Sequence, residues 1–280
     1  MPAFYAHKRF GEAVIATLPP AFQENIQKYI DAFRLGTQGP DILFYHHPIR
    51  ANAVRQKGVD LHHQSAEAFF LTQAQRLLDS DRVKEQDGNL VPASAYAAYI
   101  AGFICHFTLD VFVHPHVYER QATGVSHGKI ESEFDKYIFR KDNLPIRGHH
   151  VAKQLTIENG TDTACALALD ISADEAQLAI KTMRKINEMF ACKCEAFHAL
   201  AHGILKIAKM DEKFGDMFLH KKDDPRCDDL NPVLYQDLEA AIPKAAALIE
   251  DYFTRIHKHV ENGKLDEFFR HMYTGEKCHD

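Results

Sequence analysis

Residues 105–116 hold the densest group of metal-binding residue types in the sequence. His106 and Asp110 stand four positions apart, so on a helix both side chains lie on one face. A second pair with the same spacing, His127 and Glu131, follows on what reads as the next helix. Zinc readily takes imidazole nitrogens and carboxylate oxygens as ligands. The two pairs therefore predict a metal site inside a helical bundle, where facing helices supply the ligands.

A further histidine, His116, lies between the two pairs. Pro115 is expected to end the first helix, because proline lacks a backbone N–H and clashes with the preceding turn. His116 would then lie on the turn just beyond, free to fold back towards the other ligands. One His–Asp pair alone would as readily be a hydrogen-bonded core pair. Two pairs with a histidine between them favour a metal site.

The elements that must position these residues are helical almost throughout. Ser172 and Glu175 form a capping-box pattern, and Pro243 is expected to bend the last long helix. No stretch alternates between apolar and polar residues as a half-buried strand would. We therefore predict a single all-α domain over residues 1–280, with the apolar faces of the helices packed on one another. Helices are expected over residues 20–34, 65–78, 94–113, 126–140, 172–208 and 231–259.

Residues 95–113 form an apolar run long enough to cross a bilayer. It contains His106 and Asp110, and a charged group at the centre of a bilayer costs a few kcal/mol. No Lys/Arg asymmetry flanks the run, as it would flank a membrane span. We expect a buried central helix with polar groups along one face.

Composition limits the function classes further. The net charge of −6 argues against non-specific binding to a polyanion, which normally requires a basic excess. The 18 histidines are many for 280 residues and are consistent with metal ligation. The six cysteines form no CxxC pair, so free thiols in a reducing compartment are expected. With no signal peptide apparent, we expect a cytoplasmic protein.

The order of the ligand-type residues resembles the signature of the zinc-dependent phospholipase C family. More distant relatives of that family are secreted zinc-dependent single-strand nucleases. The resemblance covers roughly residues 5–140, and His116 is preferred over His114 because its spacing from Asp110 suits the family better. The matching pattern is HxxxDxxxxxH followed by HxxxE, here His106, Asp110, His116, His127 and Glu131.

The resemblance also implies roles for earlier residues. His7 matches the early histidine of the family. Asp41, in Gly39–Pro40–Asp41, matches an aspartate held near the metals as a base or an orienter of water. His62 matches a later histidine, with His63 as the alternative. The implied ligand sets are His62, His106 and Asp110 for one ion, His116, His127 and Glu131 for a second, and His7 with bridging Asp110 for a third.

By this resemblance the protein would be a phosphoesterase with two or three zinc ions, acting on a small phosphodiester or a phospholipid head group. Secreted relatives also use a processed N-terminal amine at the third site, so we expect that ion to bind more weakly here or to be absent. The alternatives are a nuclease or nucleotidase on the same scaffold, with nucleic acid less favoured, and a metal-binding protein without activity.

Overall fold

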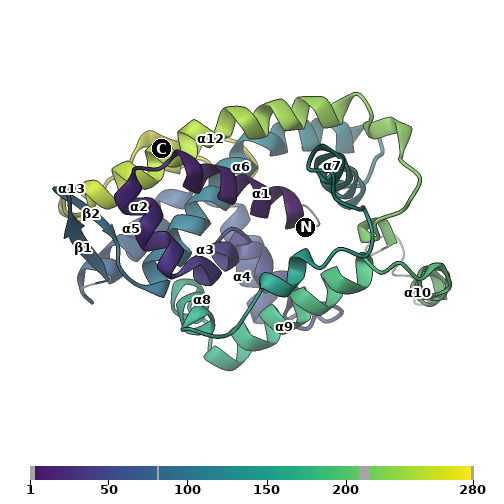
Figure 1. Cartoon of the computed structure of the whole chain (residues 1–280), viewed down its shortest axis with the longest axis horizontal. Helices are drawn as coiled ribbons and strands as arrows, with labels where there is room; N and C mark the ends of the chain where they lie inside the picture. The colour runs from purple at the N-terminus through teal and green to yellow at the C-terminus, as the bar shows by residue number, and fades with distance from the viewer. Residues whose placement is uncertain (1–3, 81, 208–214, 279–280) are drawn as a thin grey trace.

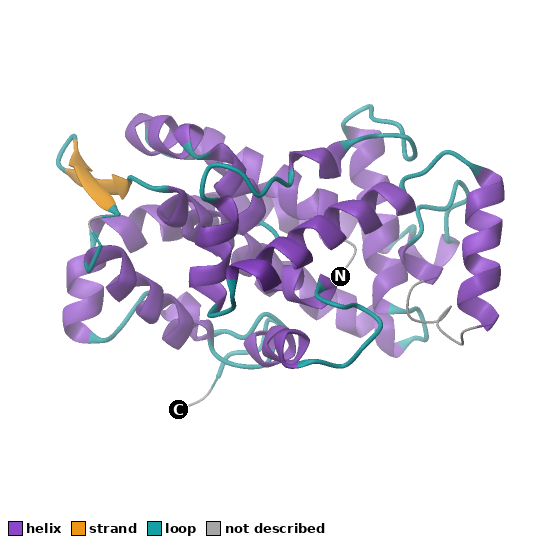
Figure 2. Ribbon diagram, turned by 90° about the horizontal axis from the view of Figure 1, so that it is seen from below, coloured by secondary structure: helices purple, strands orange, loops and turns teal. Residues whose placement is uncertain are grey.

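The structure is a computed structural model that describes residues 4–80, 82–207 and 215–278, and it is built almost entirely from helices (Figures 1 and 2). The predicted all-α fold is confirmed. Among the described residues, the only sheet is a hairpin of β1 (Val83–Gln86) and β2 (Asn89–Pro92). Its turn residues Asp87 and Gly88 both have positive φ, as a two-residue hairpin turn requires. No strand is predicted from the sequence, although an Asp-Gly pair signals such a turn.

The long helix α6 (Ala95–Ala122) runs through the centre of the protein. Ser94 caps it, because its side chain accepts a hydrogen bond from the backbone N–H of Ala97 at 3.1 Å. Among the described helices, only α6 is long and apolar enough to cross a membrane, but 94% of its apolar window is buried inside the protein. It is therefore the core helix that the sequence predicts.

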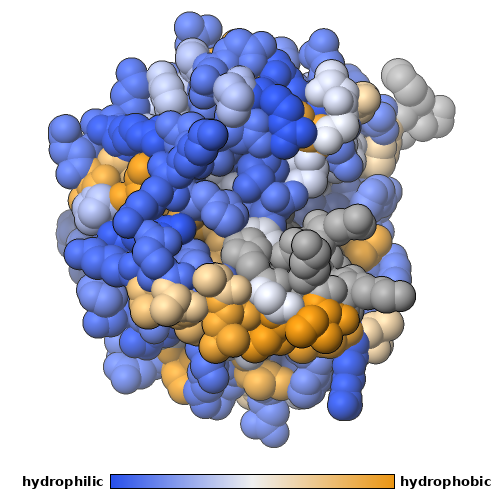
Figure 3. Space-filling model, turned by 90° about the vertical axis from the view of Figure 1, so that its right-hand side faces the viewer, coloured by the Kyte–Doolittle hydropathy of each residue, from blue (hydrophilic) through white to orange (hydrophobic). Residues whose placement is uncertain are grey.

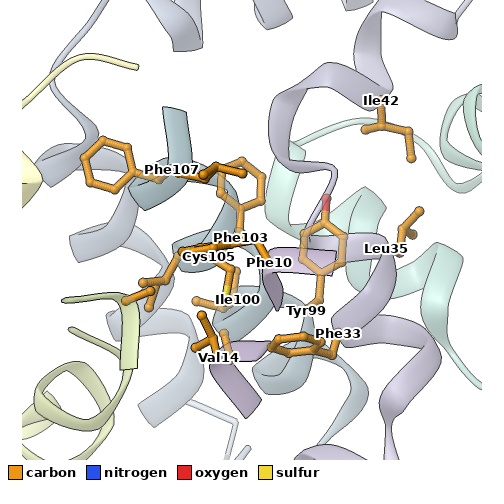
Figure 4. Packing of buried hydrophobic residues seen from close by; sticks show 14 of the residues in the cluster. Phe10, Val14, Phe33, Leu35, Ile42, Tyr99, Ile100, Phe103, Cys105 and Phe107 are labelled. Atoms are coloured by element: carbon orange, nitrogen blue, oxygen red, sulfur yellow. The ribbon is translucent and has the colours of Figure 1, made fainter. Parts of the chain in front are cut away.

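Other helices surround α6 and share one hydrophobic core with it. Figure 4 shows part of this core, where Phe103 and Phe107 of α6 lie among aromatic residues such as Phe10 and Phe33. The helices that contact α6 are α1 (Phe4–Thr17), α3 (Ile30–Gly36), α5 (Ala66–Leu78), α7 (His127–Lys141), α8 (Thr161–Leu169) and α12 (Leu230–Thr254). The other helices in the described part of the chain are α2 (Pro20–Lys28), α4 (Ala53–His62), α9 (Ala173–Phe190), α10 (Glu195–Ile207) and α13 (Ile256–Asn262). Short 3₁₀ turns are η1 (Gly39–Tyr45), η2 (Val151–Gln154), η3 (Gly215–Met217), η4 (Pro225–Cys227) and η5 (Glu267–Arg270).

Several predicted helices are divided in the structure. The first is interrupted at Tyr29, whose φ of −124° and ψ of 35° lie outside the helical region. The helix opened by the Ser172 capping box ends at Phe190, and α10 begins only at Glu195. The predicted end at residue 208 lies outside the described residues. The last long helix is interrupted at Arg255, while Pro243 lies within α12. Helices α1, α4 and α8 were not predicted.

The prediction that Pro115 ends its helix is wrong, since α6 continues through it to Ala122. Val113 and Val117 on either side are buried, and burying two apolar side chains offsets the backbone hydrogen bond that proline removes. Gly275 packs directly on this turn, because a Cβ there would lie 2.6 Å from the Pro115 Cγ. Tertiary packing thus overrides the local helix-breaking tendency.

Helices α3 and α6 approach closely enough to require glycine on both. A Cβ on Gly36 would lie 2.1 Å from the carbonyl oxygen of Tyr99, and one on Gly102 would lie 2.1 Å from that of Phe33. No real side chain tolerates such distances to backbone atoms, so the two glycines permit this crossing. The crossing brings Thr37, the residue after α3, against α6 at His106.

We expect Gly36→Ala to lower the free energy of unfolding by at least about 1–3 kcal/mol, because the added methyl group forces the two helices apart. Gly203→Ala in α10 is the matched control, since a Cβ there meets nothing within 4 Å. That change should be neutral or stabilising by up to about 1 kcal/mol. Urea unfolding followed by circular dichroism measures both, and equal effects would contradict the close crossing.

Candidate metal centre

Three residues of α6, His106, Asp110 and His114, form one buried stripe at intervals of four. The His106 Nε2 atom lies 3.2 Å from Asp110 Oδ2, and the His114 Nδ1 atom lies 3.9 Å from the same oxygen. The spacing follows from helical geometry, because residues four apart are neighbours on one face. The centre of the site is therefore set by a single continuous helix.

Helix α7 supplies the second predicted pair. Ser126 caps it by accepting a hydrogen bond from the backbone N–H of Lys129 at 3.2 Å. His127 Nε2 lies 3.1 Å from Glu131 Oε1, and His114 Nε2 lies 3.8 Å from that oxygen. His114, His127 and Glu131 each offer a ligand atom, and these atoms lie within 4.8 Å of one another.

The N-terminal helix brings His7 to the other side of Asp110. His7 Nε2 lies 3.2 Å from Asp110 Oδ1, and its ring stacks on that of His106 at a centroid distance of 4.1 Å. His7, His106 and Asp110 form a second group of ligand atoms within 4.8 Å, and all three residues are buried.

Helix α1 is held in this position by Asp135, one turn beyond Glu131 on α7. The Asp135 carboxylate accepts hydrogen bonds from the backbone N–H groups of Tyr5 at 3.1 Å and Ala6 at 2.8 Å. These amides belong to the first turn of α1, where helix geometry leaves N–H groups without partners inside the helix. Asp135 thereby fixes the helix that carries His7.

Asp41 and His62 complete a third group with His106. His62 Nε2 lies 3.2 Å from Asp41 Oδ1. Asp41 reaches this point through the turn at Gly39, whose φ of +49° favours glycine. A Cβ on Gly39 would also lie 2.1 Å from the His106 ring, so glycine is required there for space as well.

Backbone carbonyl groups orient three of the imidazole rings. His106 donates from Nδ1 to the carbonyl of Thr37 at 3.2 Å, and His62 does so to Gly58 at 2.6 Å. His114 donates from Nδ1 to Tyr273 at 2.6 Å. A carbonyl only accepts hydrogen bonds, so each Nδ1 carries a proton and Nε2 is the ring nitrogen through which each imidazole can bind a metal ion.

The donor set fits a metal ion such as zinc. The buried His106 Nε2 has no hydrogen-bond partner among the described residues, although it faces the Asp110 carboxylate. A buried polar atom without a hydrogen bond is costly unless another group, such as a metal ion, satisfies it. Its neighbours are imidazoles and carboxylates, the nitrogen and oxygen ligands that zinc takes.

Charge coupling across the site keeps its carboxylates ionised. Burial raises the pKa of Asp110, but the imidazoles of His106, His114 and His7 lower it by a larger amount. The pKa of Asp110 is therefore well below its ordinary value. Burial raises the pKa of Glu131, but neighbouring charges, those of His127 and His114 among them, lower it to well below its ordinary value. Burial lowers the pKa of His114, but Asp110 and Glu131 together raise it to about 9. The site thus holds two anionic carboxylates in the interior, those of Asp110 and Glu131, and their negative charge would stabilise a bound cation.

The structure brings together six of the seven predicted ligands, together with Asp41. The six are His7, His62, His106, Asp110, His127 and Glu131. Of the two histidines considered at the end of α4, His62 faces Asp41 and His63 is exposed. The N-terminal amine that secreted relatives use lies outside the described residues.

The assignment of His116 is corrected by the structure. Its side chain is 42% exposed and lies 3.5 Å from Asp237 on α12, away from Asp110. Since α6 continues through Pro115, His116 is six positions beyond Asp110 and faces another side of the helix. His114 takes its place beside Glu131, and its spacing of four from Asp110 was the signal that could have found it.

The chain belongs to the zinc-dependent phospholipase C family, because residues 6–184 match the family model described as zinc dependent phospholipase C. The match extends past the segment in which the sequence resemblance is strongest. It contains every residue of the three ligand groups described above. No curated protein and no solved structure matches the chain. Family membership and the buried ligand groups together support a metal-dependent, phospholipase-type function.

His114→Ala should remove about one bound metal ion per chain, whereas His116→Ala should leave the metal content unchanged. The two substitutions make the same chemical change two positions apart on one helix, but only His114 belongs to a ligand group. Elemental analysis after zinc reconstitution measures both. If His116→Ala lost the ion instead, the placement of α6 beyond Pro115 would be wrong.

Asp135→Asn should weaken metal binding at the His7 group by about 10- to 100-fold, the usual effect of removing a group that positions a ligand. An asparagine can accept from only one of the two amides of α1. Asp142→Asn is the control, because Asp142 also holds α1 but through the Tyr5 hydroxyl at 2.7 Å and Arg9. Isothermal titration calorimetry with zinc tests both variants. Equal losses of zinc affinity would show that general loosening of α1 is responsible.

Proposed function

We propose that the protein is a hydrolase of phosphodiester bonds that uses two or three zinc ions and favours a phospholipid head group as substrate. The observation that supports this most directly is the arrangement of three ligand groups, two of which share His106, in the buried centre of the bundle. Membership of the zinc-dependent phospholipase C family supports the same reaction class.

The ligand groups suggest how the ions would be held. One would take His62 and His106, which form a group with Asp41, and also Asp110 beside His106. A second would take His114, His127 and Glu131. A third would lie between His7 and the other oxygen of Asp110. Bound zinc ions polarise a phosphoryl group, lower the pKa of water and stabilise a leaving oxygen. The residues of the chain supply the geometry, the negative charge and the exclusion of bulk water.

Asp41 is the proposed catalytic residue. Burial raises its pKa, but the hydrogen bond with His62 and the charge of His106 lower it to about 2, so it is ionised at neutral pH. An ionised carboxylate beside the ligands can take the proton of the attacking water or orient that water. Asp41 also lies within ligand distance of His62 and His106, so the same geometry would allow it to bind a metal. The two roles differ in what happens when the carboxylate becomes an amide.

Asp41→Asn should lower kcat for a nitrophenyl phosphocholine by about 10²–10⁴-fold and leave the zinc content nearly unchanged. The amide keeps the size of the side chain but cannot accept a proton. Steady-state kinetics near neutral pH and elemental analysis of the same preparation measure both quantities.

The outcomes separate the alternatives. Loss of a zinc ion from Asp41→Asn would make Asp41 a ligand and not the base. Cleavage of single-stranded nucleic acid but not of phosphodiesters or phospholipids would favour a nuclease on the same scaffold. A fully zinc-loaded protein that cleaves none of the three would be a metal-binding protein without this activity.

A further inference from the structure

Helix α10 exposes a continuous apolar stripe. The three large side chains in it, Leu200, Ile204 and Ile207, are 63%, 56% and 87% exposed. Figure 3 views the side of the molecule that carries α10 and shows a band of hydrophobic side chains across it. Residues three and four apart on a helix share a face, so the stripe covers one side of α10 over its whole length. The stripe comprises Ala196, Ala199, Leu200, Gly203, Ile204 and Ile207, all of them exposed.

The opposite face of α10 is fixed to the protein, so the stripe points outwards. Phe197 and Ala201 pack against a small core of Phe190 and Phe218. At the start of the helix, Glu195 pairs with Arg147 at 3.0 Å. The charged group at this end is therefore already paired within the protein, and the exposed stripe contains no charged residue.

Packed side chains connect the base of α10 with the candidate metal centre. Phe190, which anchors α10, also lines a small pocket with Tyr5 and Asp135. Asp135 lies one helical turn from Glu131 on α7. Asn187 lines the same pocket and lies 3.5 Å from the hydroxyl of Tyr45, in the turn that carries Asp41. A partner bound on the stripe would lie on the side of this pocket.

The size and charge of the stripe indicate its partner. A stable protein interface takes about 20–30 residues from each side, and the six residues of the stripe fall well short of that. A short helix with an apolar face can instead lie in the surface of a bilayer with its apolar side chains among the acyl chains. The net charge of −6 disfavours attraction to an anionic surface.

We propose that α10 docks the protein on zwitterionic phospholipid surfaces through Leu200, Ile204 and Ile207. The docking proposal rests on the proposed function, because docking would bring a phospholipase-type site to its lipid substrates. The docking itself requires no turnover, so it can be tested separately from the reaction.

The chain contains no Trp, so a single introduced Trp reports on its own surroundings without background. Leu200→Trp should show a blue-shifted and stronger emission when phosphatidylcholine vesicles are added to the zinc-loaded protein. Leu178→Trp on α9 is the matched control, because Leu178 is also exposed, at 36%, but lies outside the stripe. The Asp41→Asn background keeps the vesicles intact during the measurement.

A second variant tests the stripe without a reporter. Ile204→Glu should lower the fraction of protein that floats with phosphatidylcholine vesicles by about tenfold or more, since a charged group must leave water to enter the bilayer. Its hydrolysis of a soluble nitrophenyl phosphocholine should stay unchanged. If vesicles bind but no phosphodiester is cleaved, the proposed function fails while the docking surface stands.

Three results would overturn the proposal. The first is an emission of Leu200→Trp that does not respond to phosphatidylcholine vesicles. The second is an emission already blue-shifted in buffer together with a dimer in sedimentation, which would assign the stripe to a second copy of the chain. The third is binding to phosphatidylserine vesicles alone, which would show electrostatic attraction in place of apolar docking.

Discussion

The buried carboxylate of Asp110 is the charge around which the interior of this protein is organised. Its side chain is only 4% exposed, and a carboxylate removed from water is costly unless it is paired. Three imidazoles from two helices face it, those of His7, His106 and His114. Without Asp110 these rings would lack their common partner, and the three ligand groups would lose the residue that links them.

The packing of the backbone serves the same arrangement. The close crossing of α3 and α6 at Gly36 and Gly102 places the Thr37 carbonyl where it fixes the His106 ring. The C-terminal segment contributes in the same way, because the Tyr273 carbonyl fixes His114. Segments far apart in the sequence thus hold the imidazoles in one orientation, and the cost of ordering them is met by the packing of the core around α6.

Helix α7 connects the site with the rest of the molecule. Its stripe of His127, Glu131 and Asp135 supplies two candidate ligands and then the carboxyl group that holds α1. Beyond Asp135 lies a pocket that is lined by Phe190, and Phe190 also belongs to the small core against which Phe197 of α10 packs.

Helical periodicity in the sequence determined the all-α fold and the two same-face pairs, His106/Asp110 and His127/Glu131. These features depend on residues four apart, and such spacing is fixed wherever a helix forms. Helix boundaries were less well determined: Tyr29 and residues 191–194 interrupt helices without a strong local signal, since tertiary contacts decide such ends.

The family resemblance implied His7, Asp41 and His62, but only the tertiary structure shows how they join the pairs and that His114 does so as well. His114 replaces His116 because burial of Val113 and Val117 carries α6 through Pro115, which local propensity alone would make a helix end. His7 and Asp41 reach the site from distant segments through the Asp135 contacts and the Gly39 turn, and no spacing along the chain encodes those contacts. The sequence by itself determined the kinds of ligand and the helices that carry the two pairs. The packing of α1, α3 and the C-terminal segment on α6 decided the composition of the site, because these contacts form between residues far apart in the chain, such as His114 and Tyr273, which are 159 positions apart.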